Sequence, residues 1–207
     1  MSMYNLYKSG IPIGSRPEQH SPNYMGTNEE PWYTRGAIEF LVTDVLQEFF
    51  EVLEYGCGSS TAWFHSRVKS VTAIEHDSSW SGLVTDTISN LSPSNLKGQV
   101  NIINVPNSHT GQIKYRSVSD GRFYDEYVNR IHTLDKTFDL ICVDGRCRTA
   151  CIENSIRYIK NGGYLLIDNS ERQRYAGAIN ALPSEWDRFD FVTPVDTTTI
   201  FKVRNEK

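Results

Sequence analysis

The 207-residue chain lacks several features that would place it in a specialised class of protein. It has no apolar run of the about 18 residues that a membrane span needs. Its opening residues, MSMYNLYKSGIPIG, lack the charged and apolar regions of a secretory signal. We therefore expect a soluble, cytoplasmic protein with no membrane partner.

An excess of basic residues is also missing. Lys and Arg together number 21 against 25 Asp and Glu, which gives a formal net charge of -4 and a pI near 5.7. A generic nucleic-acid binder usually carries a strongly basic domain or stripe. The composition therefore predicts a protein with no nucleic-acid partner.

The four cysteines form neither a CxxC pair nor a Cys/His set with zinc spacing. We expect reduced, structural thiols, as is usual in the cytosol. The hydrophobic fraction is 39%, and together with 14 glycines this is typical of an ordinary globular chain. At this length, one domain is the natural prediction.

An N-terminal arm is predicted at residues 1–34, followed by a single domain at 35–207. The arm contains four prolines, which exclude a regular helix or a central strand: Pro12, Pro17, Pro22 and Pro31. Its aromatic residues either cap a substrate site or mediate a homodimer, and they include Tyr24, Trp32 and Tyr33.

Strand and helix patterns alternate through the rest of the chain. Apolar residues at helical spacing predict a helix at 35–50, carried by Ile38, Leu41, Val45, Leu46 and Phe49. Strands are expected at 51–55, 70–75, 100–105, 138–143 and 163–167, and helices at 59–68, 78–91, 123–134, 148–160 and 173–182. This alternation predicts an α/β, Rossmann-like, doubly wound and mostly parallel sheet. FDFVT and TIFKV near the C-terminus predict an antiparallel hairpin at its edge.

The first strand ends in a glycine turn, within VLEYGCGSST at residues 52–61. Glycines at a strand-to-helix turn allow positive φ and let a ligand approach the backbone. The next strand ends at Glu75, nineteen residues past Gly56, near the spacing at which an acid meets a ribose in such folds. A tight turn alone is the other explanation for these glycines.

VLEYGCGSST followed by VTAIEHD resembles the cofactor motifs of class I methyltransferases that use S-adenosylmethionine, and the terminal hairpin resembles that family's seven-stranded sheet. The resemblance spans about residues 35–203. It implies that the cofactor is bound by Glu54, Gly56, Gly58, Ser60, Glu75 and His76. Glu75 would hold the ribose hydroxyls, and His76 would flank the adenine. The family's frequent third glycine is Ser59 here, and a dinucleotide site is disfavoured because Thr61 replaces the last glycine of GxGxxG.

Acidic and amide side chains follow the next two strands of the series. Asp144 ends one strand, and Asp168 with Asn169 ends the next. These hard oxygen ligands suit Mg²⁺ or another divalent cation. The pattern resembles the cation-dependent O-methyltransferases of small molecules, although Cys147 stands where those relatives usually have a lysine. The general base is therefore unassigned.

Four arginines flank these acids and admit two explanations: Arg146, Arg148, Arg172 and Arg174. In one, they pair with Asp144, Asp168, Glu153 or Glu171 and no metal binds. In the other, they form a cationic rim for a carboxylate or phosphate of the acceptor. On that second explanation, Asp144, Arg146 and Arg172 are the candidate catalytic residues. Lys114 and Arg116, on a long loop at 106–122, are placed to close over the same ligand.

The function we predict from the sequence is S-adenosylmethionine-dependent O-methylation of an anionic small molecule, with divalent-metal assistance. Sugar acids, phosphorylated metabolites and natural-product intermediates are candidate acceptors. Two alternatives stay open: a metal-free N- or O-methyltransferase, and a non-catalytic regulatory protein that binds the cofactor. Trp80 either packs beside the adenine or belongs to the core, and His109 is either a base or solvated.

Overall fold

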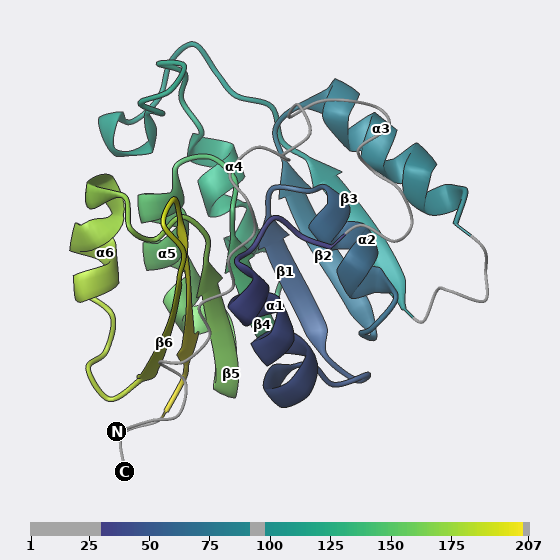
Figure 1. The fold of residues 1–207 in the computed structure, drawn as a ribbon. Helices are drawn as coiled ribbons and strands as arrows, with labels where there is room; N and C mark the ends of the chain where they lie inside the picture. The colour runs from purple at the N-terminus through teal and green to yellow at the C-terminus, as the bar shows by residue number, and fades with distance from the viewer. Residues whose placement is uncertain (1–29, 92–97, 205–207) are drawn as a thin grey trace.

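A computed structural model describes residues 30–91 and 98–204 of the chain. Its centre is one seven-stranded sheet in the order β3-β2-β1-β4-β5-β7-β6 (Figure 1). The strands are β1 (Glu51–Tyr55), β2 (Ser70–Glu75), β3 (Gln99–Asn104), β4 (Phe138–Val143), β5 (Ile159–Ile167), β6 (Asp187–Val192) and β7 (Thr197–Lys202). The first five run parallel, and β7 pairs antiparallel with both β5 and β6. The predicted fold class, including the C-terminal hairpin, is confirmed.

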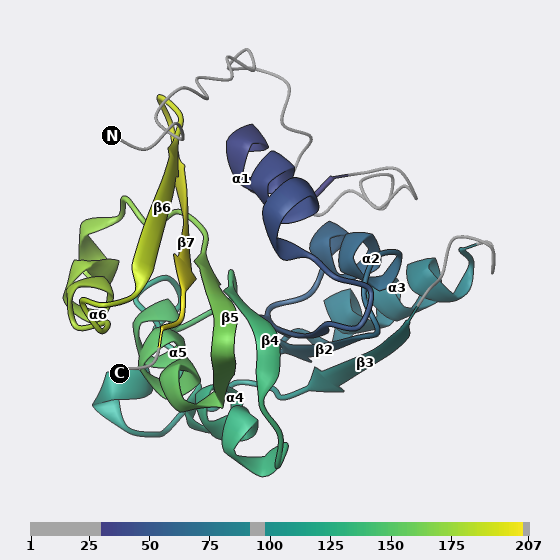
Figure 2. The same cartoon turned by 90° about the horizontal axis from the view of Figure 1, so that it is seen from below.

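Helices cover both faces of the sheet (Figure 2). One face carries α1 (Arg35–Phe40), α2 (Ser59–His65) and α3 (Ser78–Ser89). The opposite face carries α4 (Asp125–Asn129), α5 (Arg148–Ser155) and α6 (Ala176–Asn180). None of the helices within residues 30–91 and 98–204 has the length and apolar character of a membrane span.

Alternate residues of the central strands pack against the two helical layers on opposite faces of the sheet. On β1, Val52 packs with the side chains of α1 and α2, whereas Leu53 and Tyr55 pack with those of α4 and α5. Because side chains alternate along a strand, Glu54 projects to the same face as Val52. The parallel register aligns Tyr55 with Ile74 on one side and with Val143 on the other. The turns that follow β1, β2, β4 and β5 therefore lie along one edge of the sheet.

The helix predicted at 35–50 is shorter than expected. It ends at Phe40 and continues as a π-helical turn, Leu41–Val45, closed by a 2.8 Å hydrogen bond from Leu46 N–H to Leu41 C=O. Leu46 then turns extended, and residues 46–50 carry the chain to the start of β1. Phe49 is consequently 66% exposed and does not belong to the core stripe.

Two later helices also end early, in 3₁₀ turns. The helix expected at 123–134 is α4 followed by Arg130–Thr133, and the one expected at 148–160 is α5 followed by Ile156–Tyr158. Short 3₁₀ segments are common at the ends of α-helices. The second turn releases the chain early enough for β5 to begin at Ile159.

Candidate functional site

Glu75 joins the end of β2 to the glycine turn after β1. One carboxylate oxygen accepts a hydrogen bond from Cys57 N–H at 3.1 Å, and the other accepts from the N–H groups of His76 and Asp77 at 2.7 and 2.8 Å. The side chain is buried. Burial alone would raise the pKa of Glu75, but hydrogen bonds from His76 and Asp77 lower it below the ordinary value. Glu75 is therefore a carboxylate at neutral pH.

The glycine turn itself packs against the turn after β4. Gly56 has φ +99°, a conformation that side chains disfavour. A Cβ atom there would lie 3.3 Å from the Cα atom of Gly145. Gly145 in turn lies against Tyr127, whose hydroxyl would be 2.0 Å from an added Cβ. Both glycines are thus required for two backbone turns to meet closely at the edge of the sheet.

Trp80, on α3, packs against the same turn. Its indole N–H donates to the C=O of Cys57 at 2.7 Å, and the ring lies 3.8 Å from the position of a Cβ on Gly58. Asp77 caps α3 by accepting from Ser79 and Trp80 N–H groups, which fixes the start of that helix. Trp80 therefore borders the predicted cofactor turn and is partly buried.

Glu54 lies buried beneath this turn, at 2% exposure. Burial raises the pKa of Glu54 to about 7, while the hydroxyls of Ser60 and Thr61 act in the opposite direction and the nearby Asp144 adds to the rise. Its Oε2 atom has no hydrogen-bond partner among the residues that the structure describes. A buried carboxyl with a free oxygen at this position could accept a hydrogen bond from a ligand.

The segment before α1 contributes Tyr33, one of the aromatic residues expected either to cap a substrate site or to mediate a homodimer, and Thr34, which the sequence pattern did not single out. Tyr33 is buried on the α1 face, and its hydroxyl contacts the thiol of Cys142 but no oxygen or nitrogen partner within the described stretches. Thr34 N–H donates to Thr198 Oγ1 at 3.0 Å, and Thr198 Oγ1 donates to Asp168 Oδ1 at 3.0 Å. The end of the predicted arm therefore reaches the acids at the edge of the sheet. The aromatic pair Trp32 and Tyr33 was the available signal.

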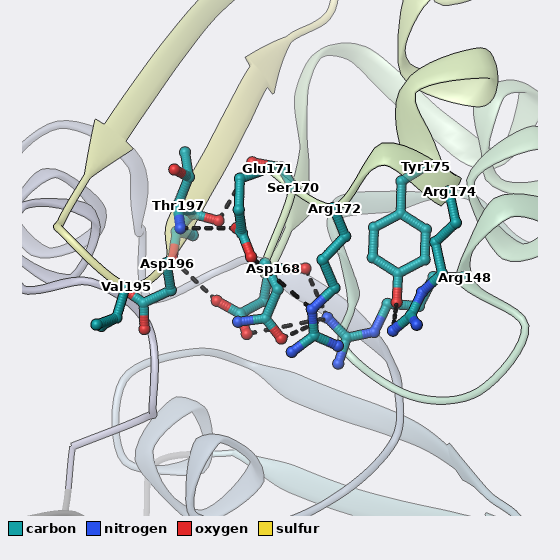
Figure 3. Close-up of polar contacts among 12 residues, drawn as sticks. Arg148, Asp168, Ser170, Glu171, Arg172, Arg174, Tyr175, Val195, Asp196 and Thr197 are labelled. Carbon is teal, nitrogen blue, oxygen red and sulfur yellow. Dashed lines mark hydrogen bonds and ion pairs between the residues drawn. The ribbon is translucent and has the colours of Figure 1, made fainter. Parts of the chain in front are cut away.

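The three predicted metal ligands lie together, but an arginine lies among them. Arg148, at the start of α5, has Nη2 at 2.6 Å from Asp144 Oδ1, and its Nη1 lies 3.4 Å from Asn169 Oδ1 and 3.9 Å from Asp168 Oδ2. Figure 3 shows the Arg148 contact with Asp168 beside Tyr175. Within residues 30–91 and 98–204, no cluster of three His, Cys, Asp or Glu side chains could hold a metal ion. This arrangement does not fit a divalent cation, and the predicted metal site is not supported.

Asp168 is buried more deeply than Asp144. Burial, followed by repulsion from Asp144, raises the pKa of Asp168 to about 8 in spite of Arg148 and the hydrogen bond from Thr198. Asp144 is more open, with 37% of its side chain exposed. Of the two acids, Asp144 is therefore the one that an acceptor could contact from solvent.

The other arginines separate into two places. Arg146 lies beside the cofactor motifs, with Nε 3.4 Å from His76 Nε2 and Nη1 donating to Ser119 Oγ at 2.8 Å. Arg172 lies after β5, where its Nε is 3.8 Å from Glu171 Oε1 (Figure 3). Arg174 donates to the Tyr175 hydroxyl at 3.0 Å. The contacts thus associate Arg146 with His76 and the other two with the end of β5.

The long connection at 106–122 folds back on itself. Ser108 and Arg116 each form an antiparallel bridge with Phe123, and Arg116 donates to the C=O of Gly121 at 3.1 Å. Tyr124 donates to Asp120 at 2.6 Å. The ammonium group of Lys114 lies 4.4 Å from the centre of the Tyr115 ring. The connection is thus an ordered hairpin-like loop, and Arg146 ties it to His76.

Two lesser candidates for a base lie at this loop. His109 contacts the guanidinium of Arg122, with 2.7 Å between Nε2 and Nη1, and it is exposed. Cys147 occupies the position of the lysine in the relatives that the sequence resembles, and its thiol donates to Tyr115 C=O at 3.2 Å. Burial raises the pKa of Cys147 to about 12. A thiol that stays protonated cannot replace the missing lysine as a base.

Comparison with solved structures gives the same fold at low sequence identity. A methyltransferase-like protein from Silicibacter pomeroyi aligns with a TM-score of 0.58 and 23% identity, over 77% of this chain and 81% of that one. An rRNA methylase from Streptococcus thermophilus aligns with a TM-score of 0.57 and 16% identity, over 81% and 93%. A Streptococcus mutans protein in complex with SAH (S-adenosylhomocysteine) aligns with a TM-score of 0.54 and 14% identity, over 80% and 94%. The chain therefore has the class I methyltransferase fold. No protein-family profile and no curated protein sequence matches it.

These neighbours correct one prediction from composition. The acidic balance of the chain suggested that it has no nucleic-acid partner, yet the same fold over most of its length serves an rRNA methylase. That expectation was wrong, because net charge is a property of the whole chain, whereas nucleic acid is bound by local groups. The class of acceptor is thus not limited by the overall charge.

Proposed function

We propose that this chain is a methyltransferase that uses S-adenosylmethionine. The observation that carries the proposal is the buried, ionised Glu75, which accepts the N–H of Cys57 from the glycine turn. In this fold a carboxylate at the end of the second strand can bind both hydroxyls of a ribose. The turn beside it brings backbone, rather than side chains, to the edge of the sheet at Gly56.

Different residues of the chain would bind the nucleoside end and the amino-acid end of the cofactor. Glu75 would bind the ribose, and Trp80 with His76 would border the adenine. Glu54, whose free oxygen lies below the glycine turn, would accept a hydrogen bond from the amino-acid end. The cofactor supplies a methyl group on a sulfonium. Binding and orientation by the chain would align that group with the acceptor, which is a large part of the catalysis of such transfers.

For the acceptor, we infer an anionic small molecule whose nucleophile is an oxygen or a nitrogen. Arg172 supports this, because its side chain is 42% exposed and its ion pair with Glu171 is long, at 3.8 Å. A guanidinium with free N–H groups binds carboxylates and phosphates in a bidentate manner. Asp144 is partly exposed. It follows β4, which lies between β1, with its glycine turn, and β5, after which Arg172 lies. Asp144 would accept a hydrogen bond from the nucleophile.

A methylation assay tests the enzyme directly. The protein is incubated with radiolabelled S-adenosylmethionine and three separate pools: small anionic metabolites, total RNA and small neutral metabolites. Label in a product that depends on the protein supports the proposal, and the labelled pool identifies the acceptor class. Binding of S-adenosylmethionine without label in any pool would favour the regulatory alternative. Absence of cofactor binding would refute both.

Two arginine variants test how the acceptor and the cofactor are bound. Arg172→Ala should raise the Michaelis constant of the acceptor much more than that of the cofactor. Arg146→Ala should raise that of the cofactor, because Arg146 contacts His76. Arg157→Ala is the matched control, since Arg157 lies over Tyr158, on the turn after α5. Equal effects of Arg172→Ala on both constants would exclude Arg172 from acceptor binding.

A further inference from the structure

The guanidinium of Arg148 ties together the ends of two neighbouring strands. It donates to the backbone C=O of Asp144 at 2.7 Å and to that of Asp168 at 2.5 Å, and also to Gly145 C=O at 3.1 Å. It contacts the side-chain oxygens of Asp144, Asp168 and Asn169 as well. Only 11% of the side chain is exposed. A positive charge is therefore built into the place where oxygen ligands from β4 and β5 converge.

The backbone conformations next to Arg148 and next to Asp168 indicate that the surrounding structure holds these contacts in place. Cys147, which immediately precedes Arg148, has φ +48°, and Asn169, which immediately follows Asp168, has φ +50°. Non-glycine residues rarely adopt such left-handed conformations, and they persist where the surrounding structure requires them. The left-handed conformation of Cys147 comes directly before α5, whose first residue, Arg148, points at the strand ends. The left-handed conformation of Asn169 turns its side-chain amide toward Arg148.

We propose that Arg148 supplies the positive charge at the acceptor end of the site, in the place that a divalent cation would otherwise take. It acts as a positioning residue that holds Asp144 and Asn169 for the acceptor. The role toward an acceptor rests on the proposed methyl transfer. The substitution of Arg148 for a divalent cation rests on the contacts of Arg148 alone. A guanidinium is always charged in proteins, so this positive charge does not depend on metal supply or pH.

Electrostatics makes the two cations mutually exclusive. A divalent ion bound to Asp144 and Asp168 would lie within a few ångströms of the guanidinium, where like charges repel strongly in a partly buried site. Removal of Arg148 leaves two carboxyl groups and an amide oxygen near one another without the positive charge of the guanidinium. Such a set is a ligand group for Mg²⁺ or Mn²⁺.

Titration with Mn²⁺, followed by electron paramagnetic resonance of the free ion, tests this replacement. The wild type should bind no Mn²⁺ up to about 1 mM, the weak end of protein sites for divalent cations. Arg148→Ala should gain one site with at least about tenfold higher affinity, and Arg148→Ala combined with Asp144→Asn should lose it again. Arg148→Lys, which keeps the charge, should behave as the wild type.

The proposal is overturned if the wild type binds Mn²⁺ in a way that Asp144→Asn abolishes, or if Arg148→Ala gains no site. Arg157→Ala, which removes an arginine that does not contact the acids, should gain none. Should Arg148→Ala fail to fold, Arg148→Gln is titrated instead, with the same two outcomes. Binding of SAH by each variant is measured in parallel. Absence of SAH binding in the wild type would refute the proposed function, and it would leave the conclusion from the Mn²⁺ titration unchanged.

Discussion

Glu75 Oε2 accepts a hydrogen bond at 3.1 Å from the backbone N–H of Cys57, across the gap between the ends of β2 and β1. This contact fixes a carboxylate beside the glycine turn, which itself lies against the turn after β4 at Gly145. It connects two segments of sequence, each of which alone would be explained by an ordinary strand end. The proposed cofactor site follows from their combination.

Substitution at Gly145 should destabilise the protein through its packing. A Cβ atom there would lie 2.0 Å from the Tyr127 hydroxyl and 2.9 Å from the backbone of Tyr55. We predict that Gly145→Ala lowers the free energy of unfolding by about 1–3 kcal/mol, as overpacked sites do. Gly177→Ala, in α6, should instead be neutral or raise it by up to about 1 kcal/mol, because within the described residues no atom beyond the local helix backbone lies within 4 Å of the new Cβ. Urea denaturation of both variants checks this, and equal effects would contradict the packing argument.

Three of the four strands that end at the site could be predicted from sequence because they are short apolar runs bounded by polar residues, whereas β5 begins at Ile159, four residues before the expected start. The expected bounds 51–55, 70–75 and 138–143 agree with β1, β2 and β4. Their order in space follows from the parallel βαβ pattern, so the meeting of Glu75 with the glycine turn was foreseeable.

The position of Arg148 was not foreseeable to the same degree. Pairing with Asp144 and Asp168 was one of two explanations for the arginines, and composition offered no choice between them. The choice depends on where α5 begins and on the left-handed conformation of Cys147, which local propensity does not indicate. The burial of Tyr33 could likewise not be read from the arm, because it arises from packing with β4 far along the chain.

Glu54 should make stability depend on pH in a defined direction. Its pKa is raised by burial from 4.5 to about 7 in the folded chain. Between these values the unfolded chain releases a proton that the folded chain keeps, so the free energy of unfolding falls as pH rises and then levels off. We predict that Glu54→Gln is more stable relative to the wild type at about pH 8 than at about pH 5, by at most about 3 kcal/mol. Denaturant titrations at both pH values measure this difference. An unchanged difference would place Glu54 in a more polar setting than proposed.

Removal of the Tyr33 hydroxyl should weaken ligand binding more than stability. Among the residues that the structure describes, the group has no oxygen or nitrogen partner and contacts the Cys142 thiol, and the Tyr33 side chain lies in the field of Glu54, Asp144 and Asp168. Tyr33→Phe should therefore leave the free energy of unfolding unchanged or raise it, because it removes a buried hydroxyl that has no oxygen or nitrogen partner within the described residues. It should weaken SAH about tenfold if the hydroxyl donates to the ligand. Tyr164→Phe, on β5 and buried on the same face, is the control. Equal SAH affinity in both variants would remove Tyr33 from the site.

Calorimetric titration of SAH into the wild type and Glu75→Gln tests the central claim most directly. The substitution keeps the size of the side chain but removes the charge that would bind the ribose hydroxyls. The account predicts one site in the wild type, an affinity at least about tenfold lower in Glu75→Gln, and no change in Glu126→Gln, an exposed residue of α4. Absence of SAH binding in the wild type, or equal affinity in the folded Glu75→Gln variant, would contradict it.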